Sequence, residues 1–339
     1  MKREALIFER PETLSATQPT NKDNIRLMVS SSHGHQHTNF SHLADYLNAG
    51  DVLVVNNSAT LPASLPVSSE LGEFRLNLST NYGSGLWLAE PRWSMAQSGP
   101  LPIHNADRFI VGDIRGQFIA PFPNLQRLWF VQFESALDSE ITNLGEAIRY
   151  AYVENRYPLD HYQTVFAQVA GSAEMPSAAY PFTNTVVDSL HDKGVQIADI
   201  TLHTGVSSLE VEVDTVEEHP LYPEPFEIPQ QTAQIVNQAK KEGRRVIAVG
   251  TTVVRSLESA WDGAQIKATS GFTRLYIHPK VGLNVVDGLI TGLHDPVTSH
   301  LAMLYTIANE SLIKEAYQEA IQEGYLWHEF GDSHLILRS

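Results

Sequence analysis

The feature that most constrains the fold is a change of hydrophobic pattern inside this 339-residue chain, at about residue 66 and again at about residue 147. Between these points, apolar side chains form short alternating runs separated by glycine and proline turns, at 74–78, 86–88, 109–111, 117–119 and 128–131. Short strands at regular spacing are typical of a small antiparallel barrel or sandwich. The sequence therefore predicts an inserted all-β domain over residues 66–146.

The flanking segments, residues 1–65 and 147–339, have the pattern of an α/β body. The run Val52-Leu53-Val54-Val55 is apolar throughout, as in a strand buried on both faces. Further strands are expected at 195–202, 246–249 and 272–277, and helices at 40–47, 185–191, 229–241, 253–261 and twice within 297–323. This alternation predicts a mostly parallel sheet with helices packed around it, and the chain length fits two domains.

Charge and composition exclude several classes of function. The formal net charge of −16 argues against broad, non-specific binding to phosphate backbones, although a small basic site remains compatible with it. The chain has no cysteine, so disulfides, thiolate metal sites and a cysteine nucleophile are excluded. We expect a cytoplasmic protein without a membrane partner, because no run approaches the length of a membrane span.

The strongest local signal is a buried strand that leads through Gly250-Thr251-Thr252 directly into a helix. Free backbone N–H groups and the positive end of the helix dipole favour a bound carboxylate or phosphate there, and two hydroxyl groups add donors. The alternative is a threonine that only caps the helix.

Two other segments supply histidines near expected strand ends. Thr201-Leu202-His203-Thr204-Gly205 ends an apolar strand, and parallel strands bring ligands to their carboxyl edge. His294 precedes a helix expected to start at Pro296; its loop has a plain alternative, in which Asp295 caps that helix. A lone histidine at either place is also compatible with a structural, hydrogen-bonded role.

A metal site is not expected. His33, His35 and His37 alternate, so in an extended strand they would share one face and could chelate a metal. Gly34 and the neighbouring serines and threonines indicate an exposed turn instead.

Seven short motifs, taken in chain order, resemble those of one protein family. They are GDVLVVNN (50–57), YQTVFA (162–167), TLHTG (201–205), VGTTVVRSLES (249–259), VDGLIT (286–291), His294 with Pro296, and Gly331-Asp332. On these motifs the chain resembles the S-adenosylmethionine:tRNA ribosyltransferase-isomerase family of queuosine biosynthesis, and VGTTVVRSLES is specific to it.

The resemblance implies an α/β barrel-like body interrupted by a β-barrel. It also implies S-adenosylmethionine as co-substrate and tRNA as partner. The ribosyl moiety of S-adenosylmethionine would move to the aminomethyl group of a deazaguanine in the anticodon and be isomerised, giving epoxyqueuosine. Adenine and methionine would leave.

For this reaction the candidate ligand-binding residues are Asn56, Asn57, Thr201, Gly250, Thr251, Thr252 and Arg255. His203 or His294 is the candidate for proton transfer, because imidazole titrates near neutral pH and a proton beside the sulfonium must be removed. Arg255 lies in the first turn of its helix, where a cation opposes the helix dipole. We therefore expect it to pair with a ligand carboxylate or, as the alternative, with an acidic residue such as Glu258.

Several positions depart from the family pattern. Ala59 and Ser64 stand where the family has arginines, and Pro181 stands where it has a histidine. Two alternatives therefore stay open: a transferase that uses S-adenosylmethionine on a small acceptor other than tRNA, and a binding protein that has kept the fold without the chemistry.

Overall fold

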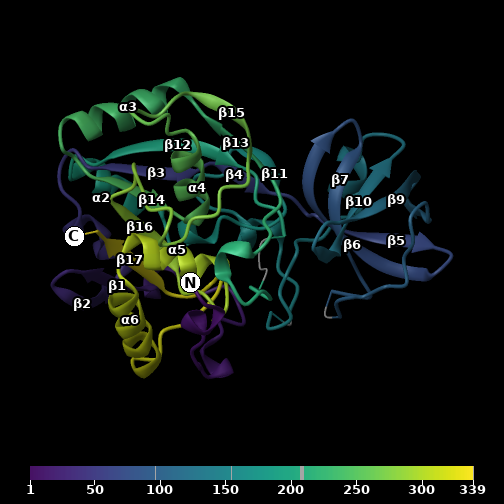
Figure 1. The fold of residues 1–339 in the computed structure, drawn as a ribbon, viewed down its shortest axis with the longest axis horizontal. Helices are drawn as coiled ribbons and strands as arrows, with labels where there is room; N and C mark the ends of the chain where they lie inside the picture. Colours follow the sequence, from purple (N-terminus) through teal and green to yellow (C-terminus); the bar gives the residue numbers. More distant parts are fainter. Residues whose placement is uncertain (96, 154, 207–209, 339) are drawn as a thin grey trace.

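The computed structural model describes residues 1–95, 97–153, 155–206 and 210–338. Two β structures organise the chain: a closed six-stranded barrel and a nine-stranded mixed sheet covered by helices. In Figure 1 the barrel lies to one side of the helix-covered sheet.

The barrel is built from one continuous stretch of chain. Its strands are β5 Ser64–Ser69, β6 Gly72–Gly83, β7 Leu86–Arg92, β8 Arg108–Val111, β9 Ile114–Phe122 and β10 Leu125–Phe133. They close in the order β10-β7-β6-β5-β8-β9 with antiparallel neighbours, and all five predicted alternating runs fall within β6 to β10. Buried aromatic rings fill the interior, among them those of Phe109 and Phe118, whose centroids lie 4.8 Å apart. The prediction of a small β-barrel is confirmed.

The body is organised by the nine-stranded sheet. Its strands, in spatial order, are β15 Thr269–Thr273, β13 Glu224–Ile228, β12 Gln196–Leu202, β3 Val52–Asn56, β14 Val246–Val249, β16 Gly288–Gly292, β17 Ser333–Leu337, β1 Arg26–Ser31 and β2 Gly34–Asn39. A separate parallel pair joins β4 Ser58–Thr60 to β11 Val169–Ser172.

Parallel pairing dominates only the middle of this sheet. Strands β12, β3, β14 and β16 are mutually parallel, whereas β13 and β15 on one side and β17 beside β16 pair antiparallel. Farther out, β17 and β1 pair parallel, whereas β1 and β2 pair antiparallel. The sheet is therefore mixed, and the expectation of a mostly parallel sheet holds without exception only for its four central strands. The strand order has two ends, β15 and β2, so the barrel-like form expected for the body is not confirmed.

Helices cover both faces of the sheet. They are α2 Asn184–Asp192, α3 Gln230–Lys241, α4 Thr251–Ser259, α5 Ser299–Ile307 and α6 Glu310–Gln322. Helix α1 Asp138–Leu144 instead packs against the barrel, with Ile141 in the barrel core. The 3-10 helices are η1 Arg3–Leu6, η2 Glu12–Leu14, η3 Lys22–Asn24, η4 Phe40–Tyr46, η5 Leu159–Tyr162, η6 Ser177–Ala179 and η7 Val216–Glu218. Within the described residues, no helix is long and apolar enough to cross a membrane.

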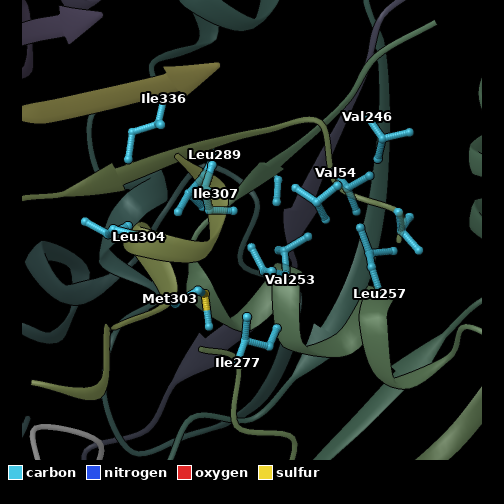
Figure 2. Packing of buried hydrophobic residues seen from close by; sticks show 14 of the residues in the cluster. Val54, Val246, Val253, Leu257, Ile277, Leu289, Met303, Leu304, Ile307 and Ile336 are labelled. Atoms are coloured by element: carbon cyan, nitrogen blue, oxygen red, sulfur yellow. The ribbon is translucent and has the colours of Figure 1, made fainter. Parts of the chain in front are cut away.

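The continuous apolar run in β3 is explained by two hydrophobic cores. Val52 and Val54 pack in the core that contains α3 to α6, whereas Leu53 and Val55 pack in the core on the opposite face. Side chains alternate along a strand, so a strand covered on both faces needs apolar residues at every position. Figure 2 shows the first core, with Val54 and Val253 among the side chains that meet between the sheet and its helices.

Some expected elements differ in their bounds or type. The segment at 40–47 is the 3-10 helix η4, and the strand expected at 272–277 is β15, which ends at Thr273. The helix expected from Pro296 begins at Ser299, because Val297 has a φ of 62°, which a right-handed helix does not allow. Asp295 does not cap this helix and instead accepts hydrogen bonds from Arg10.

Candidate functional site

A cavity of about 400 Å³ lies between the barrel and the body. Its lining combines residues from three parts of the chain. The barrel contributes Asn77, Glu90, Arg92 and Arg127; the connecting segment contributes residues 148–152; and the body contributes residues 174–178, 250–252 and 291–295 together with Thr204, Glu224, Arg255, His300, His328 and Glu329, among others.

The predicted Gly250-Thr251-Thr252 turn lies in the wall of this cavity, where β14 leads into α4. Gly250 adopts a φ of 95°, which favours glycine, and it forms the N-cap without any side-chain cap. The alternative of a threonine that only caps the helix is therefore wrong. Asn56, from the neighbouring strand β3, donates a hydrogen bond to Thr252 Oγ1 at 3.3 Å. This bond helps to fix the side chain of Thr252.

Arg255 also lines the cavity, but protein groups hold it. Its guanidinium forms an ion pair with Glu224 of β13, and its Nε donates to the carbonyl of Leu275 at 3.1 Å. The side chain of Glu224 is only 4% exposed, so this is a buried pair. Pairing with Glu258 is not observed, because Glu258 accepts backbone hydrogen bonds from residues 284–286.

His294 faces the cavity beside a second histidine. Its ring stacks on that of His300 with centroids 4.7 Å apart, and its Nε2 lies 2.7 Å from Thr291 Oγ1. Burial, followed by the charges of His300 and other histidines, lowers the pKa of His294 well below its ordinary value. Burial also lowers the pKa of His300 to about 4. Both imidazoles are therefore neutral at neutral pH.

Three other predicted site residues, Asn57, Thr201 and His203, are not part of the described lining of the cavity. Thr201 Oγ1 donates to Asn57 Oδ1 at 2.7 Å, and Asn57 Nδ2 donates to Asp199 at 2.6 Å. The Nδ1 of His203 lies 2.7 Å from Ser58 Oγ, and burial lowers the pKa of its ring. The structure thus divides the predicted residues between the cavity and this neighbouring edge of β12.

Sequence reasoning missed the charged residues that the barrel and the chain end bring to the cavity. Arg92 and Arg127 both lie near Glu90, at 3.2 and 3.6 Å. Glu174 and Glu329 bring two carboxyl groups. No local sequence motif marks these residues. They come together in space because the barrel closes and because the chain turns at residues 327–332.

Two of the three alternating histidines, His35 and His37, lie in strand β2 and contact other side chains. His35 lies 2.8 Å from Ser30 Oγ, and His37 contacts both Tyr325 and Glu319. Among the residues that the structure describes, no group of three or more histidine, aspartate or glutamate side chains could hold a metal ion.

Both positions where family arginines are missing lie away from the described cavity lining. Ala59 is in β4, and Ser64 begins β5 and accepts a hydrogen bond from Arg75. The cavity nevertheless has arginines of its own, from β7 and β10.

The chain matches the family described as "Queuosine biosynthesis protein" over residues 4–336. It is 35% identical to the S-adenosylmethionine:tRNA ribosyltransferase-isomerase of Desulfitobacterium hafniense, covering 99% of this chain and 100% of that protein. It is 34% identical to the protein of the same name from Thermus thermophilus, covering 96% of each. The crystal structure of S-adenosylmethionine tRNA ribosyltransferase from Thermotoga maritima matches 98% of this chain and 100% of that one, at a TM-score of 0.56 and 25% identity. The chain therefore belongs to the queuosine biosynthesis protein family.

Proposed function

We propose that this protein is an S-adenosylmethionine:tRNA ribosyltransferase-isomerase that works in the cavity between its barrel and its body. The names of its full-length relatives carry the reaction type. The observation that carries the site is that one cavity combines a free helix N-terminus, neutral histidines and arginines from the barrel. A tRNA substrate would place the enzyme in the cytoplasm. We also propose that the barrel, whose strands run from Ser64 to Phe133, forms the core of the inserted domain expected over residues 66–146.

S-Adenosylmethionine carries a carboxylate, a sulfonium and a polar ribose, and the body offers matching groups. Gly250, Thr251 and Thr252 offer backbone N–H groups and hydroxyls at the start of α4, which suit the carboxylate or the ribose hydroxyls. Arg255, oriented by Glu224, adds a cation at the same wall. Asn56 holds Thr252 in place.

His294 is the proposed proton acceptor. The sulfonium acidifies the neighbouring ribosyl C5′–H group, and a neutral imidazole within reach can take that proton. His294 lines the cavity and is neutral because burial disfavours its charged form. His203 remains a second candidate at the neighbouring strand edge.

The barrel wall is the proposed side for tRNA. Arg92 and Arg127 line the cavity from β7 and β10, and arginine binds phosphate oxygens with two parallel hydrogen bonds. This local basic wall fits a polynucleotide although the whole chain carries a net charge of −16.

The direct test is incubation of the purified protein with S-adenosylmethionine and tRNA that carries the aminomethyl-deazaguanine precursor. We expect adenine release and epoxyqueuosine in the tRNA, and neither product with tRNA that lacks the precursor base. Binding of S-adenosylmethionine without salt-dependent tRNA binding would instead support a transferase with a small acceptor.

A matched pair of variants tests which polar group binds S-adenosylmethionine. Thr252→Val removes a hydroxyl from the cavity, and Thr201→Val removes one from the neighbouring edge. We expect Thr252→Val to raise the KM for S-adenosylmethionine by about tenfold, as for a lost hydrogen bond of ~1.5 kcal/mol, and Thr201→Val to change it little. The reverse result would move the ligand to the edge formed by Asn57, Thr201 and His203.

A further inference from the structure

Glu329 lies on a tightly fixed turn in the cavity wall, between α6 and β17. Its neighbour His328 has a φ of 78°, which is unusual for a residue other than glycine. Phe330 on the other side is fully buried, and a Cβ atom on Gly331 would lie 2.4 Å from the carbonyl oxygen of Leu326. The turn therefore has little freedom, and it holds the Glu329 carboxyl group at the cavity.

The surroundings of this carboxyl group disfavour its charge. Among the described residues, the buried Oε1 atom of Glu329 has no hydrogen-bond partner. Its charge interacts with four ionisable side chains, those of Glu174, Tyr152, Tyr162 and Tyr180. Burial and then the charge of Glu174 raise the pKa of Glu329 to about 8. At neutral pH, the side chain therefore carries a proton that it can give away.

The histidines of the cavity cannot supply that proton. Burial lowers the pKa of His300 and His328 to about 4 and that of His294 well below its ordinary value. Their imidazoles are deprotonated at neutral pH, so they hold no acidic proton to donate. Groups whose pKa values are pushed apart in one site commonly divide the roles of acid and base.

Resting on the proposed function, we propose that Glu329 is a catalytic acid, whose carboxyl group protonates the purine as the bond between purine and ribosyl group breaks. Transfer of the ribosyl group requires this bond, between C1′ and N9, to be cleaved. Both electrons of the bond leave with the purine, and the positive charge remains on C1′ and the ring oxygen. The proton of Glu329 goes to a ring nitrogen, neutral adenine departs, and the carboxylate regains a proton from water.

Glu174 is a positioning residue in this account. It accepts a hydrogen bond from the Tyr150 hydroxyl at 2.9 Å, which fixes its carboxylate near Glu329. Its negative charge keeps the proton on Glu329, because two close carboxyl groups cannot both ionise easily.

The test compares wild type with Glu329→Gln, which keeps the shape of the side chain but cannot donate an acidic proton. We expect kcat for adenine release from S-adenosylmethionine and precursor tRNA to fall by about 10²–10⁴-fold, the range for general acid catalysis, with KM changed little. Wild-type activity should decline as pH rises through about 8, and this decline should be absent in the variant. Glu323→Gln, at the exposed end of α6, is the matched control.

A substrate with a better leaving group separates catalysis from structure. The 2-fluoroadenine analogue of S-adenosylmethionine carries an electron-poor purine that needs less protonation, so the defect of Glu329→Gln should shrink at least tenfold with it. If the wild type is active and Glu329→Gln is equally active, the assignment is wrong while the proposed function stands. An equal defect of Glu329→Gln with both substrates would have the same meaning. Absence of adenine release by the wild type would overturn the proposed function and this inference with it.

Discussion

The barrel and the body bring opposite chemistry to the same cavity. Residues 64–133 contain five arginines, no lysine, five acidic residues and a single histidine, His104. The body carries the chain's excess of negative charge and almost all of its 14 histidines, several of them buried. The barrel presents Arg127 partly exposed, whereas the body encloses Arg255 in a buried ion pair. The difference indicates that the two regions complement each other at the cavity, since the barrel brings Arg92 and Arg127 but no histidine, whereas the body brings His294, His300 and His328.

The largest expected effect is that low pH destabilises the body, which holds the buried histidines, more than the barrel. Burial lowers the pKa of His300 and His328 to about 4 and that of His334 to about 3. These values lie below the unfolded value near 6.5, so the unfolded chain binds more protons and stability falls as pH drops from about 6.5 to 4. Each histidine contributes at most about 3 kcal/mol in that window. Glu329, with its raised pKa, acts in the opposite direction above pH ~4.5.

Hydrogen exchange measured between pH 7 and 4 checks this expectation. Amides of β14 and β16 should lose protection at a higher pH than those of β6 and β7, because the barrel holds only exposed His104. Loss of protection at one common pH would mean that the two regions unfold as a single unit, and the contrast in stability would be wrong.

The next largest effect concerns the buried cation of the body. Glu224→Ala leaves the guanidinium of Arg255 without its partner, which costs about 3–5 kcal/mol for a buried pair. Glu227→Ala, on the same strand but exposed, should cost less than about 0.5 kcal/mol. Urea denaturation of both variants measures the two costs. Equal losses would show that Arg255 is not held by this pair.

The smallest effect concerns the exposed cations of the barrel. Arg127→Ala removes one cation from the cavity wall and should reduce the salt dependence of tRNA binding by about one unit of slope, whereas S-adenosylmethionine binding should not change. Arg108→Ala removes an exposed arginine from β8, in a groove elsewhere on the barrel, and serves as control. Titrations of both variants with tRNA at several salt concentrations measure how steeply the binding constant falls with salt. Identical slopes for the two variants would mean that tRNA does not bind at Arg127.

Local patterns predicted elements but not their assembly. The strand Val246–Val249 and the turn at Gly250 were predictable, because an apolar run and a glycine act over a few residues. Strand β15 was predicted too far along the chain, since its ladder with β13 depends on backbone pairing and most of its side chains are partly or fully exposed.

The candidate site was predictable only in its body half. Gly250 and His294 follow apolar strands, which marks them locally. Arg127 and Glu329 have no such signal, because their roles depend on barrel closure and on a chain turn that is packed around Gly331. The motif around Thr201 and Asn57 was as clear in the sequence, yet these two side chains bond to each other and are not part of the described cavity lining. A sequence pattern identifies a strand end but not which cavity that end meets.

The central claim is that barrel and body bind the substrates together in one cavity. Hydrogen exchange with S-adenosylmethionine and precursor tRNA bound tests it most directly. The account predicts new protection at the start of α4, residues 250–255, and at the same time at the end of β7 near Arg92. Protection confined to the edge formed by Asn57, Thr201 and His203, with neither of those segments affected, would contradict it.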